Sequence, residues 1–464
     1  MTMSAAPPCD AIVFFGATGD LAYKQVFPAL QAMARNGRLD LPVIGVARSA
    51  RHVDQFRERA RDSVRKHGGL DADAFAKLSA RLQYVSGDYH DDTTYQKLRL
   101  ALGNAARPLH YLAIPPSMFE SVIQGLARSG CARDARIVVE KPFGRDLATA
   151  QALNRTLHQS FPEDTIFRID HYLGKEAVEN LLYFRFSNTF LEPVWRRDYV
   201  ASVQITMAER FSVQGRGAFY EEVGAIRDVV QNHMLQVMTL LTMEAPMNGA
   251  ADAIRAEKLR VLNSMRPLVP TEVVRGQFRG YRAEDGVSPI SQVETFAALR
   301  LHIDNARWDG VPFYIRAGKQ LPVTCAEVMV QLKQPATAVF DAAGPGQANY
   351  LRFRLSPDVL ISVGARVKVP GEAMVGAATE LIAHRHPGDE MTPYERLLGD
   401  ALHGNAALFT SADAVEAAWR VVEPVLGNAV PVSGYEPGSW GPLAAGKIMA
   451  SGDQWHNPAL TESA

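Results

Sequence analysis

The sequence has little cysteine and no long apolar run. Its three cysteines, at positions 9, 131 and 325, lie far apart and are odd in number. This argues against a disulfide framework and against a thiolate metal site, and it fits a reducing compartment. The first ten residues, MTMSAAPPCD, lack a basic segment followed by an apolar core, and no apolar stretch reaches the roughly 20 residues of a transmembrane helix. We therefore expect a cytoplasmic protein without a membrane partner.

The sequence also lacks a net charge of either sign. Lysine and arginine number 49, aspartate and glutamate 50, so the formal net charge is −1. A chain balanced in this way has no general attraction for nucleic acid, and we expect no nucleic-acid partner. Any anionic ligand must be held by a local cluster of side chains. The length of 464 residues and the 47% hydrophobic content are typical of a globular protein with two or three domains.

The first third of the chain alternates apolar, β-branched segments with charged stretches that suit helices. Six such segments are predicted strands: residues 11–16, 41–47, 82–88, 108–114, 135–142 and 165–171. This rhythm predicts an α/β domain in which helices cover both faces of a parallel sheet.

The rhythm changes after about residue 175. Predicted strands then follow at residues 201–209, 293–303, 326–333, 349–356 and 359–367, with helices mainly at 225–243 and 394–404. Runs of strands with separate helices predict a larger α+β domain built on a mostly antiparallel sheet. We therefore expect an α/β domain at residues 1–172 and a larger α+β domain at residues 173–464.

A glycine-rich turn follows the first predicted strand. In AIVFFGATGDLA, Gly16 and Gly19 lie between this strand and a helix that includes YKQVFPALQAMAR. Glycines let the backbone approach a pyrophosphate, and the free amides at the start of a helix point towards its charge. The position of the turn, after the first strand of a βαβ rhythm, indicates a Rossmann-type dinucleotide site rather than an ordinary strand-to-helix connection.

The end of the second predicted strand bears on the choice of cofactor. Folds that select NAD tend to carry an acidic residue there, whereas this sequence reads GVARSAR. Arg48 suits a 2′-phosphate, so NADP is favoured and NAD stays open as an alternative.

Polar residues follow the fifth and sixth predicted strands. Lys141 ends IVVEK, and His171, Tyr172 and Lys175 lie in RIDHYLGKE. Ligands of open α/β sheets bind beyond the carboxyl ends of the strands, and these three donor types suit a phosphate. The alternative is a solvated loop. Farther along, Asp228 and His233 lie five positions apart on a predicted helix, and by itself His233 is more typical of a hydrogen-bonded core histidine.

Six motifs occur in one order: GATGDLA, EKPFG, RIDHYLGKE, RDVVQNH, WDGVPFYIRAGK and YERLLGDAL. With them the chain resembles the glucose-6-phosphate dehydrogenase family from about residue 11 to residue 442. The resemblance implies NADP-dependent oxidation of glucose 6-phosphate at C1 to a lactone, in the pentose phosphate pathway. It also implies a homodimer or homotetramer that binds a small sugar phosphate.

The resemblance further implies roles for single residues. His233 would be the general base and Asp170 its carboxylate partner, and no metal is expected. The implied substrate-binding residues are Lys141, His171, Tyr172, Lys175, Glu209, Asp228 and Lys319. The implied cofactor-binding residues are Gly16, Ala17, Thr18, Gly19, Asp20, Leu21, Arg48 and Lys141.

The chain departs from the family pattern in three places. Gln25 and Thr324 stand where the family usually has cations, and Tyr220-Glu221 replaces a tyrosine-aspartate pair. Each lost charge-assisted hydrogen bond of about 1.5–3 kcal/mol would weaken phosphate binding tenfold or more. Two alternatives therefore stay open: the same mechanism on a modified sugar phosphate, such as glucosamine 6-phosphate, or on another aldose; and a catalytically silent paralogue that binds sugar phosphate or NADP.

Overall fold

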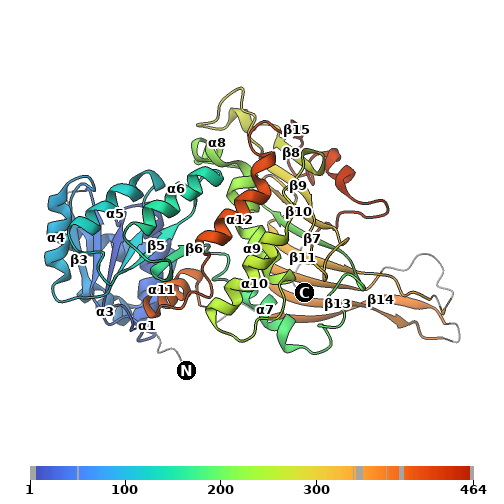
Figure 1. The fold of residues 1–464 in the computed structure, drawn as a ribbon, viewed down its shortest axis with the longest axis horizontal. Coiled ribbons are helices and arrows are strands. Elements are labelled where there is room, and N and C mark those ends of the chain that lie inside the picture. Colours follow the sequence, from blue (N-terminus) through green and yellow to red (C-terminus); the bar gives the residue numbers. More distant parts are fainter. Residues whose placement is uncertain are drawn as a thin grey trace. The chain divides into compact units, whose positions relative to one another are not determined.

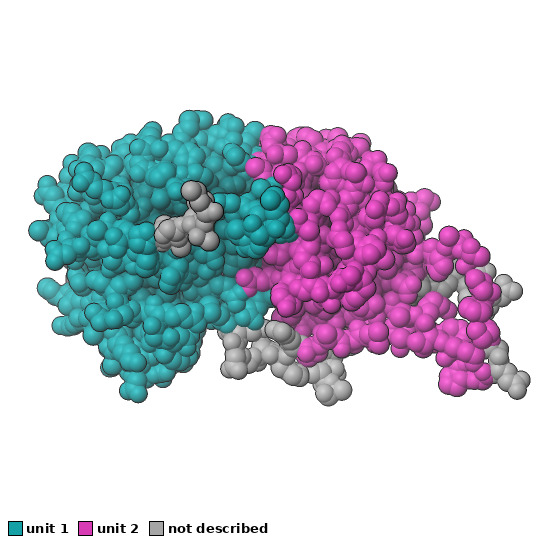
Figure 2. Space-filling model, turned by 60° about the horizontal axis from the view of Figure 1, so that its bottom comes forward, with its two compact units in different colours: residues 1–176, 246–256, 391–416 teal, residues 177–245, 257–390, 417–464 magenta. Residues whose placement is uncertain are grey.

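The computed structural model describes residues 7–49, 52–337, 339–340, 348–371, 374–385 and 391–459. The chain forms two compact units (Figures 1 and 2). Unit 1 comprises residues 1–176, 246–256 and 391–416, and unit 2 comprises residues 177–245, 257–390 and 417–464. Each unit thus combines segments that are far apart in sequence. The domain boundary between residues 172 and 173 stays a prediction.

Unit 1 is built on a six-stranded sheet with the order β3-β2-β1-β4-β5-β6 (Figure 1). Its strands are β1 (Ala11–Phe15), β2 (Val43–Ala47), β3 (Leu82–Ser86), β4 (Pro108–Leu112), β5 (Arg136–Glu140) and β6 (Ile166–Ile169). All neighbouring pairs are parallel. The α/β prediction is confirmed, and each strand lies within the segment predicted for it, because buried parallel strands are continuous apolar runs.

Helices connect these strands. They are the π-helix η1 (Ala22–Val26), α1 (Phe27–Arg35), α2 (Val53–His67), α3 (Ala72–Arg81), α4 (Asp92–Leu102), η2 (Pro116–Met118), α5 (Phe119–Arg128), α6 (Leu147–His158) and η3 (Glu163–Thr165). Aspartates begin several of them: the side chains of Asp71 and Asp146 accept hydrogen bonds from the amides of Ala74 and Thr149. These caps satisfy amides that a helix leaves unpaired at its start.

The segment 391–416 belongs to the core of unit 1 although it comes late in the sequence. Its helix α11 (Pro393–His403) buries Leu397 and Leu398 in the same core as Phe167. Arg168 of β6, which is 0% exposed, donates to Glu163 at 2.9 Å, and Glu163 also accepts from the amide of Ala412. Arg168 is therefore an internal support for this segment and not a ligand-binding cation.

Unit 2 is built on a nine-stranded sheet with the order β14-β13-β12-β11-β7-β10-β9-β8-β15. The strands are β7 (Val200–Ala208), β8 (Val273–Phe278), β9 (Phe296–Leu301), β10 (Phe313–Gly318), β11 (Cys325–Leu332), β12 (Tyr350–Ser356), β13 (Val359–Lys368), β14 (Gly376–Arg385) and β15 (Val432–Tyr435). Only the pairs β10·β7 and β15·β8 are parallel. The prediction of a mostly antiparallel sheet is confirmed, and β13 and β14 extend from it as a long two-stranded arm (Figure 1).

The remaining helices include the predicted helix at 225–243. They are α7 (Glu176–Ser187), α8 (Gly217–Ala225), η4 (Ile226–Met234), α9 (Leu235–Thr242), α10 (Ala251–Ser264), η5 (Pro270–Glu272), η6 (Tyr281–Ala283), α12 (Ala412–Val422), η7 (Glu423–Val425) and η8 (Leu443–Ile448). Within the described residues, no helix combines the length and the apolar character needed to cross a bilayer. The element η4, which carries Asp228 and His233, is a π-helix. In a π-helix residues five apart share a backbone hydrogen bond, so these two residues lie closer to one face than the α-helix assumed from sequence allows.

Candidate active site

The turn after β1 requires a glycine at its first position. Gly16 has a φ of +79°, and a Cβ there would lie 2.1 Å from the carbonyl oxygen of Ala113. Only glycine therefore fits this position. The Gly16 amide donates to the carbonyl of Val46 at 3.0 Å and to the hydroxyl of Tyr89 at 2.8 Å. These contacts fix the turn between neighbouring strands and leave Gly19 and Asp20 exposed at its tip.

An arginine of α2 also supports this turn. The guanidinium of Arg59 donates to the carbonyl of Thr18 at 2.7 Å, and it lies 4.7 Å from the centre of the Tyr23 ring. The hydroxyl of Tyr23 in turn donates to Asp62 of the same helix. Sequence reasoning missed Arg59, because nothing in its local sequence relates it to a turn about 40 residues earlier.

Arg48 follows β2 at the position predicted for selecting the cofactor, and its side chain is exposed. The next residue, Ser49, is tied down: its carbonyl accepts from Tyr84 at 2.7 Å and from Ser86 at 3.2 Å. The backbone beside Arg48 is therefore anchored to β3, while the guanidinium stays accessible to a ligand.

The turn after β6 gathers most of the residues predicted to bind phosphate. Asp170 is 2% exposed, and its carboxylate accepts from the amide of Tyr172 at 3.0 Å. The ammonium of Lys175 lies 3.8 Å from the centre of the Tyr172 ring, a cation–π contact. His171 packs edge to face on Tyr172 and lies parallel to the ring of Tyr394, from α11. Aromatic rings thus contact both His171 and Lys175, and Lys141 follows the adjacent strand β5.

Three further predicted residues lie together in unit 2. Glu209 follows β7 and Lys319 follows β10, and these strands run parallel with Ala208 opposite Gly318. The ammonium of Lys319 is 2.5 Å from the carboxylate of Glu209 and 5.4 Å from the centre of the Tyr220 ring. Burial, followed by the charge of Asp228, raises the pKa of Tyr220 well above its ordinary value. Glu209, Asp228 and Lys319 thus surround one buried phenol.

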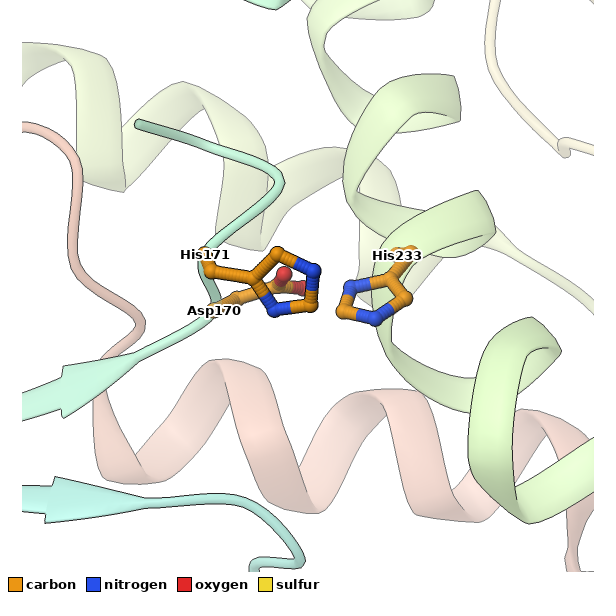
Figure 3. Close-up of side chains that lie close together, drawn as sticks. All are labelled: Asp170, His171 and His233. Carbon is orange, nitrogen blue, oxygen red and sulfur yellow. The ribbon is translucent and has the colours of Figure 1, made fainter. Parts of the chain in front are cut away.

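The predicted acid-base residues belong to one cluster. Asp170, His171 and His233 each offer one ligand atom, and these atoms all lie within 4.8 Å of one another (Figure 3). Figure 3 shows the two imidazoles facing each other, with the carboxylate of Asp170 behind the ring of His171. His233 is 2% exposed and comes from η4. Carboxylate and imidazole groups at this spacing suit proton transfer, and they are also donor types that bind divalent metals.

The departures from the family pattern have separate structural contexts. Gln25 is exposed on η1. Thr324 accepts a hydrogen bond from the amide of Arg210 at 3.1 Å, directly beside Glu209. Glu221 accepts from Tyr281 at 2.8 Å and from Ser291 at 2.6 Å, so within unit 2 it supports the loop 281–291.

Sequence reasoning also missed a buried acid beside this edge of the parallel sheet. Glu140, the last residue of β5, is 8% exposed and accepts from the hydroxyl of Tyr111 at 2.6 Å. A second phenol, Tyr394, hydrogen-bonds the same carboxylate. The available signal was an acid next to Lys141 at a strand end, but its two partners come from distant parts of the chain.

Comparisons with known proteins cover nearly the whole sequence. The family "Glucose-6-phosphate dehydrogenase, NAD binding domain" matches residues 13–180, and "Glucose-6-phosphate dehydrogenase, C-terminal domain" matches residues 182–456. The chain is 42% identical over 455 residues to "Glucose-6-phosphate 1-dehydrogenase 1" of Mycobacterium tuberculosis (strain ATCC 25618 / H37Rv), covering 97% of each chain.

Two solved structures extend the comparison. A glucose-6-phosphate 1-dehydrogenase from Mycobacterium avium shares 41% identity with a TM-score of 0.92, over 98% of this chain and 100% of that one. A glucose-6-phosphate dehydrogenase in complex with its substrate glucose 6-phosphate shares 35% identity with a TM-score of 0.90, over 97% and 100%.

Proposed function

The chain belongs to the glucose-6-phosphate dehydrogenase family, and on that premise we propose that it oxidises glucose 6-phosphate at C1 to 6-phosphogluconolactone with NADP as the hydride acceptor. The observation that carries the proposal is the likeness, over 97% of this chain, to a glucose-6-phosphate dehydrogenase whose structure contains its substrate. Likeness over both units includes every segment that contributes a predicted site residue.

His233 acts in this proposal as the general base. It takes the proton of the C1 hydroxyl, the hydride leaves C1, and the C1–O bond becomes the carbonyl of the lactone. Asp170 orients the imidazole and stabilises the imidazolium that forms, as a buried carboxylate does in other His-Asp pairs. The spacing of these groups within one cluster supports the assignment.

The residues of the turn after β1 fit a dinucleotide. The glycine-only position at Gly16 and the exposure of Gly19 and Asp20 at the start of the following helix support this assignment. When bound, the dinucleotide accepts the hydride from C1. Arg48 pairs with the 2′-phosphate, which favours NADP over NAD because a guanidinium matches phosphate geometry.

The turn after β6 binds the 6-phosphate. His171, Tyr172 and Lys175 donate to the phosphate oxygens, while Glu209 and Asp228 accept from sugar hydroxyls. Lys141 and Lys319 bridge the sugar and the cofactor. The ion pair between Lys319 and Glu209 supports this role for Lys319, because it places the two proposed substrate-binding residues side by side.

One panel of assays tests the proposed function. The purified protein is supplied with NADP or NAD and with glucose, glucose 6-phosphate, glucosamine 6-phosphate or galactose 6-phosphate, and reduction is followed by absorbance. We expect the largest kcat/KM for glucose 6-phosphate with NADP. A larger value for glucosamine 6-phosphate or glucose would instead favour the modified-substrate alternative, which Gln25 and Thr324 motivate.

The same panel addresses the silent paralogue. Binding of NADP or glucose 6-phosphate by calorimetry without turnover of any sugar would contradict the proposal. The homodimeric or homotetrameric assembly and the cytoplasmic location stay predictions. Size-exclusion chromatography with light scattering measures the molar mass of the assembly.

A further inference from the structure

Glu140 lies at the edge of the parallel sheet where the predicted anion-binding turn begins. It is the last residue of β5 and pairs in register with Ile169, the last residue of β6, which directly precedes Asp170. Its carboxylate accepts from Tyr111 of β4 at 2.6 Å and is hydrogen-bonded by Tyr394 of α11. Three elements therefore enclose one carboxyl group.

The surroundings of Glu140 favour its protonated form. The pKa of Glu140 is raised to about 7, because burial and the charge of Asp170, which raise it, outweigh the hydrogen bonds from Tyr111 and Tyr394 and the charge of Lys141, which lower it. Tyr111 comes from β4, Tyr394 from α11, and Asp170 from the turn after β6. A carboxyl group in this balance changes charge near neutral pH, where its ordinary counterpart is fully ionised.

This carboxyl group is linked to the anion-binding turn in two ways. The ring of Tyr394, which hydrogen-bonds Glu140, lies parallel to the ring of His171 with their centres 6.5 Å apart and an interplanar angle of 11°. Glu140 also directly precedes Lys141 in the chain. A negative charge on Glu140 therefore lies close to two of the predicted phosphate-binding residues, His171 and Lys141.

We propose that Glu140, held by Tyr111 and Tyr394, is a positioning residue whose protonated form permits tight binding of the sugar phosphate and whose ionised form weakens it. This inference rests on the proposed function, because it assumes that Lys141 and His171 meet an anionic substrate. The physical reason is charge. An ionised Glu140 repels the phosphate, and it also attracts Lys141, which the phosphate needs as a partner.

The first experiment measures KM and kcat for glucose 6-phosphate from pH 6 to pH 8.5. We expect the KM of the wild type to rise about three- to tenfold as Glu140 ionises, the order of effect of one like charge near a partly screened site. In Glu140→Gln this rise is lost, and KM changes more than kcat. The ionisation of the substrate phosphate is common to both proteins and cancels in the comparison.

A second variant tests the hydrogen bond that holds the acid. Tyr111→Phe removes a donor that lowers the pKa of Glu140, so the rise in KM moves to higher pH. Tyr95→Phe is the matched control, because Tyr95 is another buried tyrosine of unit 1 whose hydroxyl donates to the backbone carbonyl of Tyr89 at 2.7 Å. The control keeps the pH profile of the wild type.

The outcomes separate the inference from the proposed function. A folded Glu140→Gln protein that keeps the wild-type pH dependence of KM overturns the inference, and if that variant does not fold, an unshifted profile in Tyr111→Phe does so. If the wild type does not oxidise glucose 6-phosphate, the proposed function fails, and the affinity for inorganic phosphate against pH replaces KM as the readout. A 13C NMR titration that finds the Glu140 carboxyl group ionised below pH 5 also overturns the inference.

Discussion

In the parallel sheet of unit 1, strands β1 and β2 are buried along their full length and carry no charged side chain, whereas the sheet of unit 2 holds Arg275 within β8 and Glu327 within β11. Arg275 pairs with Glu294 at 2.8 Å, both 4% exposed, and Glu327 pairs with Arg354 at 3.0 Å. We call these two ion pairs the interior pairs.

The difference shows which charged residues indicate a functional site and which only support the fold. In unit 1 the residues after β5 and β6 include Lys141, Asp170, His171 and Lys175, at the carboxyl edge where ligands bind, whereas the buried Arg168 within β6 is an internal support. The interior pairs instead hold strands and loops together: Arg275 also donates to the carbonyl of Val430 at 2.7 Å. Substitutions of site residues should therefore lower activity with little effect on stability. Substitutions in the interior pairs should mainly lower stability.

The largest expected effect is on turnover. His233→Asn removes the proposed base and should lower kcat by about 10²–10⁴-fold with a small change in the KM for glucose 6-phosphate. Steady-state kinetics measure this, and the exposed His403→Asn is the control. A His233→Asn protein with normal turnover would remove the residue from its proposed role.

The next effect is on stability. Arg275→Leu leaves Glu294 buried without its ion-pair partner and should lower the free energy of unfolding by about 3–5 kcal/mol. Arg128→Leu breaks an exposed pair with Asp92, whose side chains are 54% and 63% exposed, and should cost below about 1 kcal/mol. Urea denaturation compares the two, and equal losses would contradict the distinction between interior and exposed charge.

Glu140 connects the two kinds of behaviour, because it is buried and also borders the site. Its pKa is raised from 4.5 to about 7, so the unfolded chain loses this proton at lower pH than the folded one. Stability therefore falls as pH rises from about 4.5 to about 7, by about 3 kcal/mol in total. Glu140→Gln should remove that part of the slope in denaturation curves recorded at several pH values. An unchanged slope would mean that Glu140 is ionised in both states.

A smaller effect is expected at the phosphate-binding turn. Lys175→Ala should raise the KM for glucose 6-phosphate by about tenfold to a hundredfold, because one charge-assisted hydrogen bond is lost. The KM for glucose should change much less. The exposed Lys368→Ala, on β13, should change neither value. Equal changes for both sugars in Lys175→Ala would show that this lysine does not recognise the phosphate.

The smallest expected effect concerns the cofactor. Arg48→Ala should weaken NADP binding by about tenfold and leave NAD binding unchanged, since we propose that the guanidinium pairs with the 2′-phosphate, which NAD lacks. Fluorescence titration with both dinucleotides measures the preference. The exposure of Arg48 makes a loss of stability unexpected, so an unfolded variant would point to a structural role.

Strand prediction succeeded where burial and sequence pattern agree. The segment AIVFF is apolar at every position, and β1 is buried at every position. The strands β8, β10, β14 and β15 were not predicted. In β8 and β10, VVRGQF and FYIRAG each place an arginine among apolar residues. The free-energy cost of burying Arg275 and Arg316 is offset by hydrogen-bond acceptors that come from other segments.

The sequence by itself determined the alternation of strands and helices in unit 1, the glycine turn at Gly16 and the polar character of the turn from Asp170 to Lys175, because each depends on neighbours within a few residues. Only the tertiary structure decided that Arg168 is an internal support, that Asp228 and His233 lie on a π-helix, and that Glu140 is enclosed by two phenols. Hydrogen-bond partners and burial set the charge and the role of such groups, and both come from segments that meet only when the chain folds.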